Sequence, residues 1–340
     1  MKKRVVLKDI AEEAGVSIAT VSLALSGSDR VSPETAKKVV EIARRLQYVP
    51  KARAGKRTRT AGYVIGFVLP DIMNSFYAEL ALHVGVELEQ HGASLIVCNT
   101  NLSEEMEKSY IDMAKQGFMD AIIFASSGNF SPSISEADIK NLHANYLPVL
   151  AVHRETQFGF IPTIDSDRKN GMVKIIHHLA ELGHRDIAFI GGYNEEGDCA
   201  TLLSGFTEAL QDLGLPVRQE WIMDGHYSMQ GGFDQMQRLL ELSRRPTAVA
   251  CANDIMACGA LRAVSKAGLK VPDDIALTGF DNSEVSRYTT PSLTTVDMCL
   301  ADVGRTAAQT ILTMLKNQSV PAVQIYPAEI IVRESTVKSA

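Results

Sequence analysis

The residues of this chain that are best placed to recognise another molecule lie in the segment 7–25, LKDIAEEAGVSIATVSLAL. Apolar residues recur there at helical spacing on both sides of a short turn. Gly15 can end the first helix in the left-handed conformation, and Ser17 can cap the second by accepting from a free amide. Such a helix-turn-helix can place its second helix in a DNA major groove. The turn alone is equally compatible with a compact helical hairpin that has no DNA role.

The charge of the chain is distributed unevenly, with a basic beginning and an acidic remainder. Residues 1–60 contain 14 Lys and Arg against 6 Asp and Glu, a net charge of +8, whereas the other 280 residues carry −14. A basic segment of this kind favours a polyanionic partner. Because the segment also carries patterned apolar residues, we expect a folded basic domain rather than a solvated tail.

A third helix should begin at Ser32-Pro33-Glu34 and complete a three-helix core. Ser32 can cap it, Pro33 suits the first helical position, and Glu34 suits the positive end of the helix. The apolar stripe that follows consists of Ala36, Val39, Val40, Ala43 and Leu46. Residues 51–60, KARAGKRTRT, have no large apolar side chain and indicate a basic linker that is disordered in isolation.

The rest of the chain alternates short apolar runs with amphipathic segments. Strands are expected at 63–69, 94–98, 121–124, 149–152, 187–190, 248–251 and 275–277. Helices are expected at 76–90, 104–116, 168–182, 205–213, 230–242 and 253–267. This pattern is typical of parallel sheets covered on both faces, and the strands are too many for one sheet of usual width. We therefore predict two Rossmann-like lobes, with a ligand at the carboxyl ends of the strands.

The composition indicates a cytoplasmic protein. No apolar run reaches the length of about 18 residues that a membrane span needs. The basic N-terminus is followed by charged residues instead of an apolar core, so no secretion signal is expected. Five scattered cysteines without a CxxC pair favour reduced thiols in the cytoplasm.

The sequence contains no pattern that predicts catalysis, and we expect neither enzyme activity, nor a cofactor, nor a metal site. The motifs GxxxxGK[ST], GxGxxG, GxSxG and HExxH are absent. Gly191-Gly192 follows an expected strand, where it fits a tight turn better than a ligand contact. Asp165 and Asp167 could form a carboxylate pair, although capping the helix that begins at Arg168 is the simpler role.

Taken in order, several motifs resemble those of the LacI/GalR family of bacterial transcription regulators along nearly the full chain. They are LKDIAEEAGVSIATVS, RVSPETAKKVVEIARRLQYVP, DIMNSFYAEL, LGHRDIAFIGG, ANDIMACGALRAVSKAGLKVPDDIALTGFDN and TTPSLTTVDM. The resemblance implies an all-α helix-turn-helix head on an α/β body like that of periplasmic sugar-binding proteins. It also implies a dimer, or a dimer of dimers, whose operator affinity changes when a small effector binds between the lobes.

The resemblance implies the domain boundaries as well. Residues 1–50 would form the DNA-binding domain, 51–60 the basic hinge linker, and 61–340 the effector-binding and dimerisation body. The chain would cross between lobes near 161–163, 289–293 and 319–323. The N-lobe would then comprise about 61–161 and 293–320, and the C-lobe about 162–290 and 321–340.

The family's DNA contacts carry over to the head with one departure. The implied contacts are Leu7, Ser17, Ile18, Ala19, Thr20, Ser22 and Leu23. Where the family commonly has arginine, this chain has Leu23, which can make only apolar contact, for instance with a thymine methyl. Packing on the hinge is the alternative role of Leu23.

The hinge departs further from the family, which usually places a leucine there to wedge into the minor groove. No leucine occurs between Leu46 and Leu69, and the wedge position falls on Arg57. The expected hinge contacts are Lys51, Ala52, Arg53, Lys56 and Arg57. We hypothesise that these basic residues bind phosphates or a narrow minor groove. A solvated basic linker is the alternative.

The implied effector contacts are Phe76, Tyr77, Ser126, His153, Arg154, Leu202, Tyr227, Asn253, Asp281 and Met298. Family members that bind sugars often have Arg, Asp and Gln where this chain has Leu202, His153 and Met298. The ligand would then have a flatter or more apolar part than a hexose, or an acidic group for His153 and Arg154. A structural ion pair of Arg154 at the interlobe crossover is the alternative.

We therefore expect a cytoplasmic, ligand-responsive DNA-binding transcription regulator, and a repressor in particular. Its partners would be a near-palindromic double-stranded operator, a second copy of the chain and a small effector, either a sugar, a sugar derivative or another metabolite. No membrane partner is expected. A solute-binding protein without DNA function is the main alternative, and an enzyme that uses the cleft is the second.

Overall fold

The computed structural model describes residues 7–25, 31–46, 62–125, 134, 138–140, 142, 147–153, 159–192 and 198–337. The chain forms two compact units, residues 1–60 and residues 61–340, which are called here the head and the body. Each unit has its own hydrophobic core.

The described part of the head consists of three short helices around a small core. They are α1 (Leu7–Ala14), α2 (Ile18–Leu25) and α3 (Pro33–Arg45). The core contains Ile10, Ala11, Ala14, Val21, Ala24, Val31, Val39, Ile42 and Ala43. These are largely the residues at which apolar side chains recur with helical spacing, so each helix buries one stripe and exposes the rest.

Three residues place the ends of these helices as the sequence predicts. Gly15 adopts a φ of 71° after α1, a left-handed conformation that glycine tolerates at no steric cost. Ser17 accepts a hydrogen bond from the amide of Thr20 at 3.0 Å and so caps α2. Ser32 caps α3 in the same way, with the amide of Thr35 at 3.3 Å.

The first lobe of the body is a parallel sheet of six strands in the order β11-β5-β4-β3-β1-β2. These are β1 (Val64–Leu69), β2 (Ser94–Asn99), β3 (Ala121–Ala125), β4 (Val149–Val152), β5 (Thr163–Ser166) and β11 (Val323–Tyr326). The helices are α4 (Ser75–Gln90), α5 (Glu104–Lys115) and α12 (Leu300–Leu315).

Both faces of this sheet are covered, which explains why its central strands are wholly apolar. Ile65 and Phe67 of β1 belong to the core that contains α4 and α12. Val68, which points to the other face, belongs to the core that contains α5. The period-2 alternation of a strand thus divides one apolar run between two cores.

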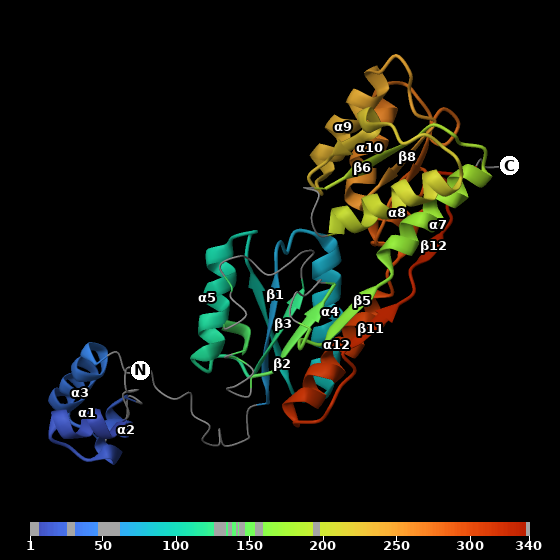
Figure 1. The fold of residues 1–340 in the computed structure, drawn as a ribbon. Coiled ribbons are helices and arrows are strands. Elements are labelled where there is room, and N and C mark those ends of the chain that lie inside the picture. Colours follow the sequence, from blue (N-terminus) through green and yellow to red (C-terminus); the bar gives the residue numbers. More distant parts are fainter. Residues whose placement is uncertain are drawn as a thin grey trace. The chain divides into compact units, whose positions relative to one another are not determined.

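The second lobe contains a parallel four-stranded sheet in the order β7-β6-β8-β9 and an antiparallel pair, β10 with β12. These are β6 (Ile187–Gly191), β7 (Ile222–Asp224), β8 (Ala248–Cys251), β9 (Ala276–Thr278), β10 (Thr295–Asp297) and β12 (Glu329–Ile331). Its helices are α7 (Arg168–Glu181), α8 (Asp198–Asp212), α9 (Met229–Glu241), α10 (Asp254–Lys266) and α11 (Val285–Tyr288). The pairs α7–α8 and α9–α10 pack together and contact the sheet (Figure 1).

The strand pairing extends the first lobe beyond the expected crossovers at 161–163 and 319–323. β5 pairs with β4 and with β11, so the chain leaves the six-stranded sheet after Ser166 and again after Tyr326. Thr294 bridges Thr278 of β9, and β10 pairs with β12, so the chain stays with the second lobe through Asp297, past the expected crossover at 289–293. These short strands contain polar residues, which is why the apolar pattern does not reveal them.

In the described part of the chain, no helix combines the length and apolar character that a membrane crossing requires. All five cysteines are free thiols.

Candidate functional sites

Helix α2 exposes the residues that the sequence places at DNA. Ser17 and Ala19 are exposed, and Ile18 is 49% exposed although it is a large apolar residue. Val21, on the opposite face, is fully buried in the head core. The helix therefore has the division that a recognition helix needs, with one face held by the head and the other available to a groove.

Several of the expected DNA contacts also have structural roles. The Ser17 hydroxyl lies 2.8 Å from that of Thr20, in addition to capping α2. Leu7 and Leu23 are partly buried and pack against the head core. Packing of Leu23 within the head was not expected, and it leaves only part of this side chain for a base.

The basic hinge residues Lys51, Ala52, Arg53, Lys56 and Arg57 lie outside the described residues, as do Ser126 and Arg154 in the body. Ser22 is placed in α2 by its backbone.

A buried polar cluster in the body joins His153, Asp165 and Arg168. His153 follows β4, is 1% exposed, and adopts a φ of 50°. Its Nδ1 lies 2.9 Å from Oδ1 of Asp165, and Nη2 of Arg168 donates to Oδ2 at 3.1 Å. The same Oδ1 accepts from the amide of Ser166 at 2.7 Å. One carboxylate at the carboxyl end of β5 therefore orients two side chains that are themselves buried.

The protonation states of this cluster follow from burial and from the contacts within it. Burial raises the pKa of Asp165, but the hydrogen bond from His153 and the charge of Arg168 outweigh this effect, and the net pKa is lowered. Burial lowers the pKa of His153 despite the neighbouring carboxylate. The pair is therefore an ionised carboxylate and a neutral imidazole at neutral pH.

Asp165 and Arg168 are the functional candidates that sequence reasoning missed. Of the two carboxylates Asp165 and Asp167, only Asp167 caps α7, by accepting from the amide of Asn170 at 3.2 Å. The signal was present, because a helix needs one capping residue and a second carboxylate two positions earlier needs another role.

Aromatic side chains line the same region. The ring of Phe76, in the first turn of α4, meets the His153 ring edge-on with centroids 5.1 Å apart. It contacts the ring of Tyr77 in the same manner, also at 5.1 Å. All three rings are buried, so they form a largely apolar wall beside the polar atoms of His153.

The ring of Tyr227, a residue of the second lobe, packs against Gly192 and occupies the space that a side chain at position 192 would need. A Cβ added at Gly192 would lie 1.7 Å from the Tyr227 ring, so no larger residue fits at 192 without moving it. The Tyr227 hydroxyl is buried and has no hydrogen-bond partner among the described residues. Burial raises its pKa, as do the nearby Cys199, Tyr77 and Asp281. Gly192 therefore serves the packing of Tyr227.

Asn253 and Asp254 form hydrogen bonds to backbone groups of the second lobe. Asn253 caps α10 through the amide of Met256 at 2.8 Å, and its side-chain amide donates to the Tyr227 carbonyl at 3.5 Å. Asp254 accepts from the amide and the hydroxyl of Ser283 at 2.7 and 2.8 Å, and from the hydroxyl of Thr295 at 2.6 Å. Both side chains are nearly fully buried. Asn253, an expected effector contact, thus also caps α10.

Asp281 lies between acidic and basic neighbours in the region that Tyr227 occupies. Its φ is 96°, an uncommon value for a residue with a side chain. Burial raises its pKa well above the ordinary value, and the carboxylates of Asp254 and Glu79 raise it further, whereas Arg168 lowers it. Asp281 and Tyr227 are thus within electrostatic range of each other and of Arg168.

Leu202 and Met298 are buried at 3% and 1% exposure and belong to the main core. Ser166, which follows Asp165, donates its hydroxyl to the Met298 carbonyl at 2.7 Å.

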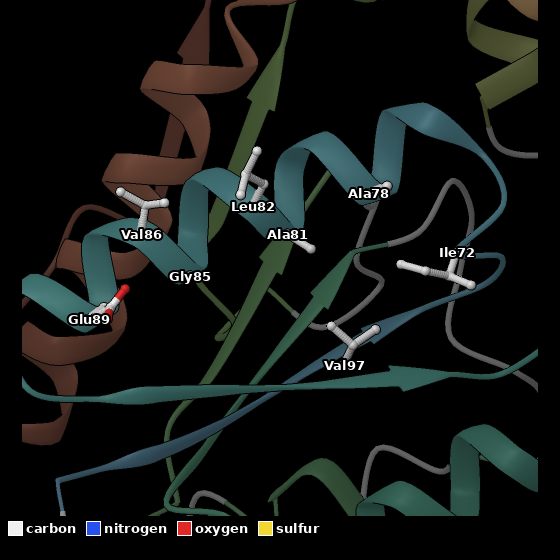
Figure 2. Close-up of a pocket in the computed structure, with 8 residues that line it drawn as sticks. All are labelled: Ile72, Ala78, Ala81, Leu82, Gly85, Val86, Glu89 and Val97. Carbon is white, nitrogen blue, oxygen red and sulfur yellow. The ribbon is translucent and has the colours of Figure 1, made fainter.

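A separate surface feature lies on the first lobe, where α4 and β2 form an apolar groove of about 440 Å³. Figure 2 shows its lining, with Ile72 before the helix, Val97 on the strand and the remaining residues along one side of α4. Leu82 and Val86 are 61% and 49% exposed, and Val97 is 44% exposed. This concentration of exposed aliphatic side chains is typical of a protein interface.

Comparisons with known proteins agree with the resemblance found in the motifs. A family profile for bacterial regulatory proteins of the lacI family matches residues 6–51, and one for a periplasmic binding protein-like domain matches residues 176–336. The chain is 33% identical to catabolite control protein A of Priestia megaterium over 339 residues. The alignment covers 98% of this chain and 99% of that protein.

Solved structures show the same relationship. The lac repressor dimer bound to operator and the anti-inducer ONPF matches with a TM-score of 0.72 and 27% identity, over 98% of this chain and 100% of that one. The complex of the transcriptional regulator CelR with cellobiose matches with a TM-score of 0.71 and 27% identity, with the same coverage. This chain therefore belongs to the LacI family of bacterial regulatory proteins, in which a DNA-binding helix-turn-helix head is joined to a periplasmic-binding-protein-like body.

Proposed function

We propose that this protein is a transcriptional repressor that binds a near-palindromic operator as a homodimer and responds to a small effector bound between the two lobes of its body. The observation that carries this proposal is the exposed start of α2, where Ser17, Ile18 and Ala19 are exposed while Val21, on the opposite face, is buried in the head core. Two such helices in one dimer can enter successive major grooves one helical turn apart.

The character of this face indicates how the operator is read. Ile18 and Ala19 can contact thymine methyl groups, whereas Ser17 and Thr20 offer hydroxyls to either bases or phosphates. Because polar base contacts are few, much of the affinity would come from the basic residues of the head and hinge. That part of the binding weakens steeply with salt.

The groove on α4 and β2 is proposed as part of the dimer interface, with a second copy of the chain as its occupant. A related structure, the lac repressor bound to operator, is a dimer, and it matches this chain over nearly its whole length. Pairing two copies about a twofold axis would cover Leu82, Val86 and Val97 in both. It would also place two heads on one operator.

The effector is proposed to bind where His153, Tyr227 and Asp281 come together, with Phe76 as an aromatic wall. The CelR relative is described in complex with cellobiose, which supports a carbohydrate-related ligand here. Apolar Leu202 and Met298 favour a ligand with a flatter or more apolar part than a bare hexose. The effector would act by binding one lobe arrangement better than the other.

The experiment that tests this proposal begins with selection of double-stranded DNA on the purified full-length protein. Enriched sequences should contain two related half-sites, and fluorescence anisotropy should show an affinity that falls linearly with salt on logarithmic axes. Ile18→Asp should abolish specific binding without unfolding the head, because Ile18 is half exposed. Glu41→Ala, on the exposed face of α3, is the matched control.

A panel of sugars, sugar derivatives and nucleosides then tests effector response through release of the selected DNA. The proposal is wrong if selection enriches no inverted repeat, or if Ile18→Asp binds the selected DNA as tightly as the unsubstituted protein.

A further inference from the structure

We propose that the Asp165 carboxylate fixes His153 as a hydrogen-bond acceptor toward the effector, so that the effector presents an uncharged hydroxyl or amino group to His153 and not a carboxylate or phosphate. This inference rests on the proposed effector site and names the chemical class of its ligand. Asp165 is a positioning residue in this role, since it acts through His153.

The first step concerns the proton on His153. Nδ1 lies 2.9 Å from Oδ1 of Asp165, and an ionised carboxylate can only accept. Nδ1 must therefore carry the hydrogen. In a neutral imidazole the other nitrogen then bears a lone pair, because the hydrogen bond at one nitrogen sets the state of the other.

The second step concerns the charge. The ionised groups that face His153 are Asp165 and Arg168, one of each sign. The ring itself is 1% exposed, and burial disfavours the imidazolium. His153 is thus held neutral, and Nε2 stays an acceptor at physiological pH.

The third step concerns what meets Nε2. Among the residues that the structure describes, this buried atom has no hydrogen-bond partner. It lies on a ring that follows the carboxyl end of β4 and packs against Phe76, where ligands of parallel sheets bind. A hydroxyl or amino group of the ligand can donate a hydrogen bond to Nε2. An anionic oxygen cannot, because its lone pair would face the lone pair of Nε2.

The tautomer can be measured without any ligand. The full-length protein labelled with 15N-histidine is examined by long-range 1H–15N correlation at pH 7. The expected result is a protonated Nδ1 and an unprotonated Nε2 on His153, assigned by their loss in His153→Phe. A protonated Nε2 would overturn the inference.

Ligand preference is measured by calorimetry on two matched pairs, galactose with galacturonate and adenosine with adenosine monophosphate. We expect the neutral member of a pair to bind at least about tenfold more tightly. Tighter binding of either acid would refute the proposal.

Asp165→Asn provides the sharpest test. Its amide can donate to Nδ1 and so move the hydrogen to Nε2, which turns the acceptor into a donor. The preference should then shift toward the acidic member by about tenfold or more. Asp167→Asn is the matched control, because it removes the same charge two positions away, does not contact His153, and still caps α7.

These results are distinguishable from those that test the proposed function. A protein that has the Nδ1–H tautomer and prefers the neutral ligands, but never releases its operator, would contradict the regulator and leave the inference intact. A repressor whose operator is released by galacturonate alone would support the proposed function and contradict the inference.

Discussion

The hydroxyl of Ser166 donates to the backbone carbonyl of Met298 at 2.7 Å, across 132 positions of sequence. Ser166 ends β5, where the chain first leaves the six-stranded sheet, and Met298 follows β10, where the chain returns. The bond therefore ties two of the three interlobe crossovers. Because Asp165 precedes Ser166 and contacts His153, the proposed effector site lies one residue from this tie.

Removing this tie tests whether it sets the balance between lobe arrangements. Ser166→Ala should lower the unfolding free energy by about 1–3 kcal/mol, because it leaves a buried carbonyl without a partner. It should also shift the effector concentration needed to release DNA. Thr313→Ala is the control, since its hydroxyl bonds an exposed helix carbonyl and should change stability by less than about 0.5 kcal/mol. Equal unfolding free energies for both variants, in denaturant titrations, would contradict this account.

The buried carboxyl of Asp254 should give the body a pH-dependent stability. Burial raises its pKa from 3.8 to about 6, against the hydrogen bonds from Thr295 and Ser283. The folded state therefore binds the proton more tightly than the unfolded state. Its stabilising contribution is complete below pH 3.8 and is lost as the pH rises through about 6, on the order of 1–3 kcal/mol.

Urea unfolding of the unsubstituted protein and of Asp254→Asn, compared between pH 4 and 7, measures this contribution. The difference between the two should change with pH over that range and be flat above it. Asp254→Asn should also be less stable throughout, because one of its side-chain atoms is a donor facing other donors. A difference that is independent of pH would show that Asp254 keeps its ordinary pKa.

The proposed dimer interface can be disrupted by a charge in the groove between α4 and β2. Leu82→Asp should shift sedimentation toward the monomer and weaken operator binding by about tenfold or more. This is the size of effect expected when an interface loses one residue that contributes strongly to its binding energy. Leu182→Asp places the same charge on a comparably exposed leucine at the end of α7 and should leave both properties unchanged. If the Leu82→Asp protein still sediments as a dimer, the groove between α4 and β2 is not part of the dimer interface.

The packing of Tyr227 on Gly192 gives a prediction for the effector site. Gly192→Ala places a methyl group against the Tyr227 ring and should displace it, with a loss of about 1–3 kcal/mol in stability and weaker effector binding. Gly159→Ala is the control, because a Cβ there meets nothing within 4 Å. Differential scanning calorimetry and effector titration measure the two effects. Unchanged effector affinity in Gly192→Ala would remove Tyr227 from the site.

Local chemistry predicts the head and the central strands because their signals are contained within a few residues. Ser17, Gly15 and Ser32 mark helix ends through contacts to neighbours three positions away or through their own backbone. By contrast, α12 was not predicted, and it begins after Cys299, which is left-handed and makes no side-chain cap. β5, β10, β11 and β12 are short and partly polar, and β5 and β10 find their partners β11 and β12 far along the chain.

In the candidate site, too, the sequence does not reveal roles that depend on contacts between distant residues. The motifs singled out His153, Tyr227 and Asp281, all of which belong to one electrostatic neighbourhood. They could not show that Asn253 is a cap or that Asp165 holds His153, because those roles depend on contacts made only in the folded chain. The hydrogen-bond partner of a residue, more than its type, decides what it offers to a ligand.

The shared carboxylate of Asp165 has a consequence for how this protein can diverge. Asp and Asn codons differ by a single nucleotide, so one mutation can exchange the acceptor at His153 for a donor without altering any residue that touches the ligand. A duplicated gene could in this way acquire a response to an oxidised or phosphorylated form of the original effector. Comparison of the contact residues alone would not reveal that change.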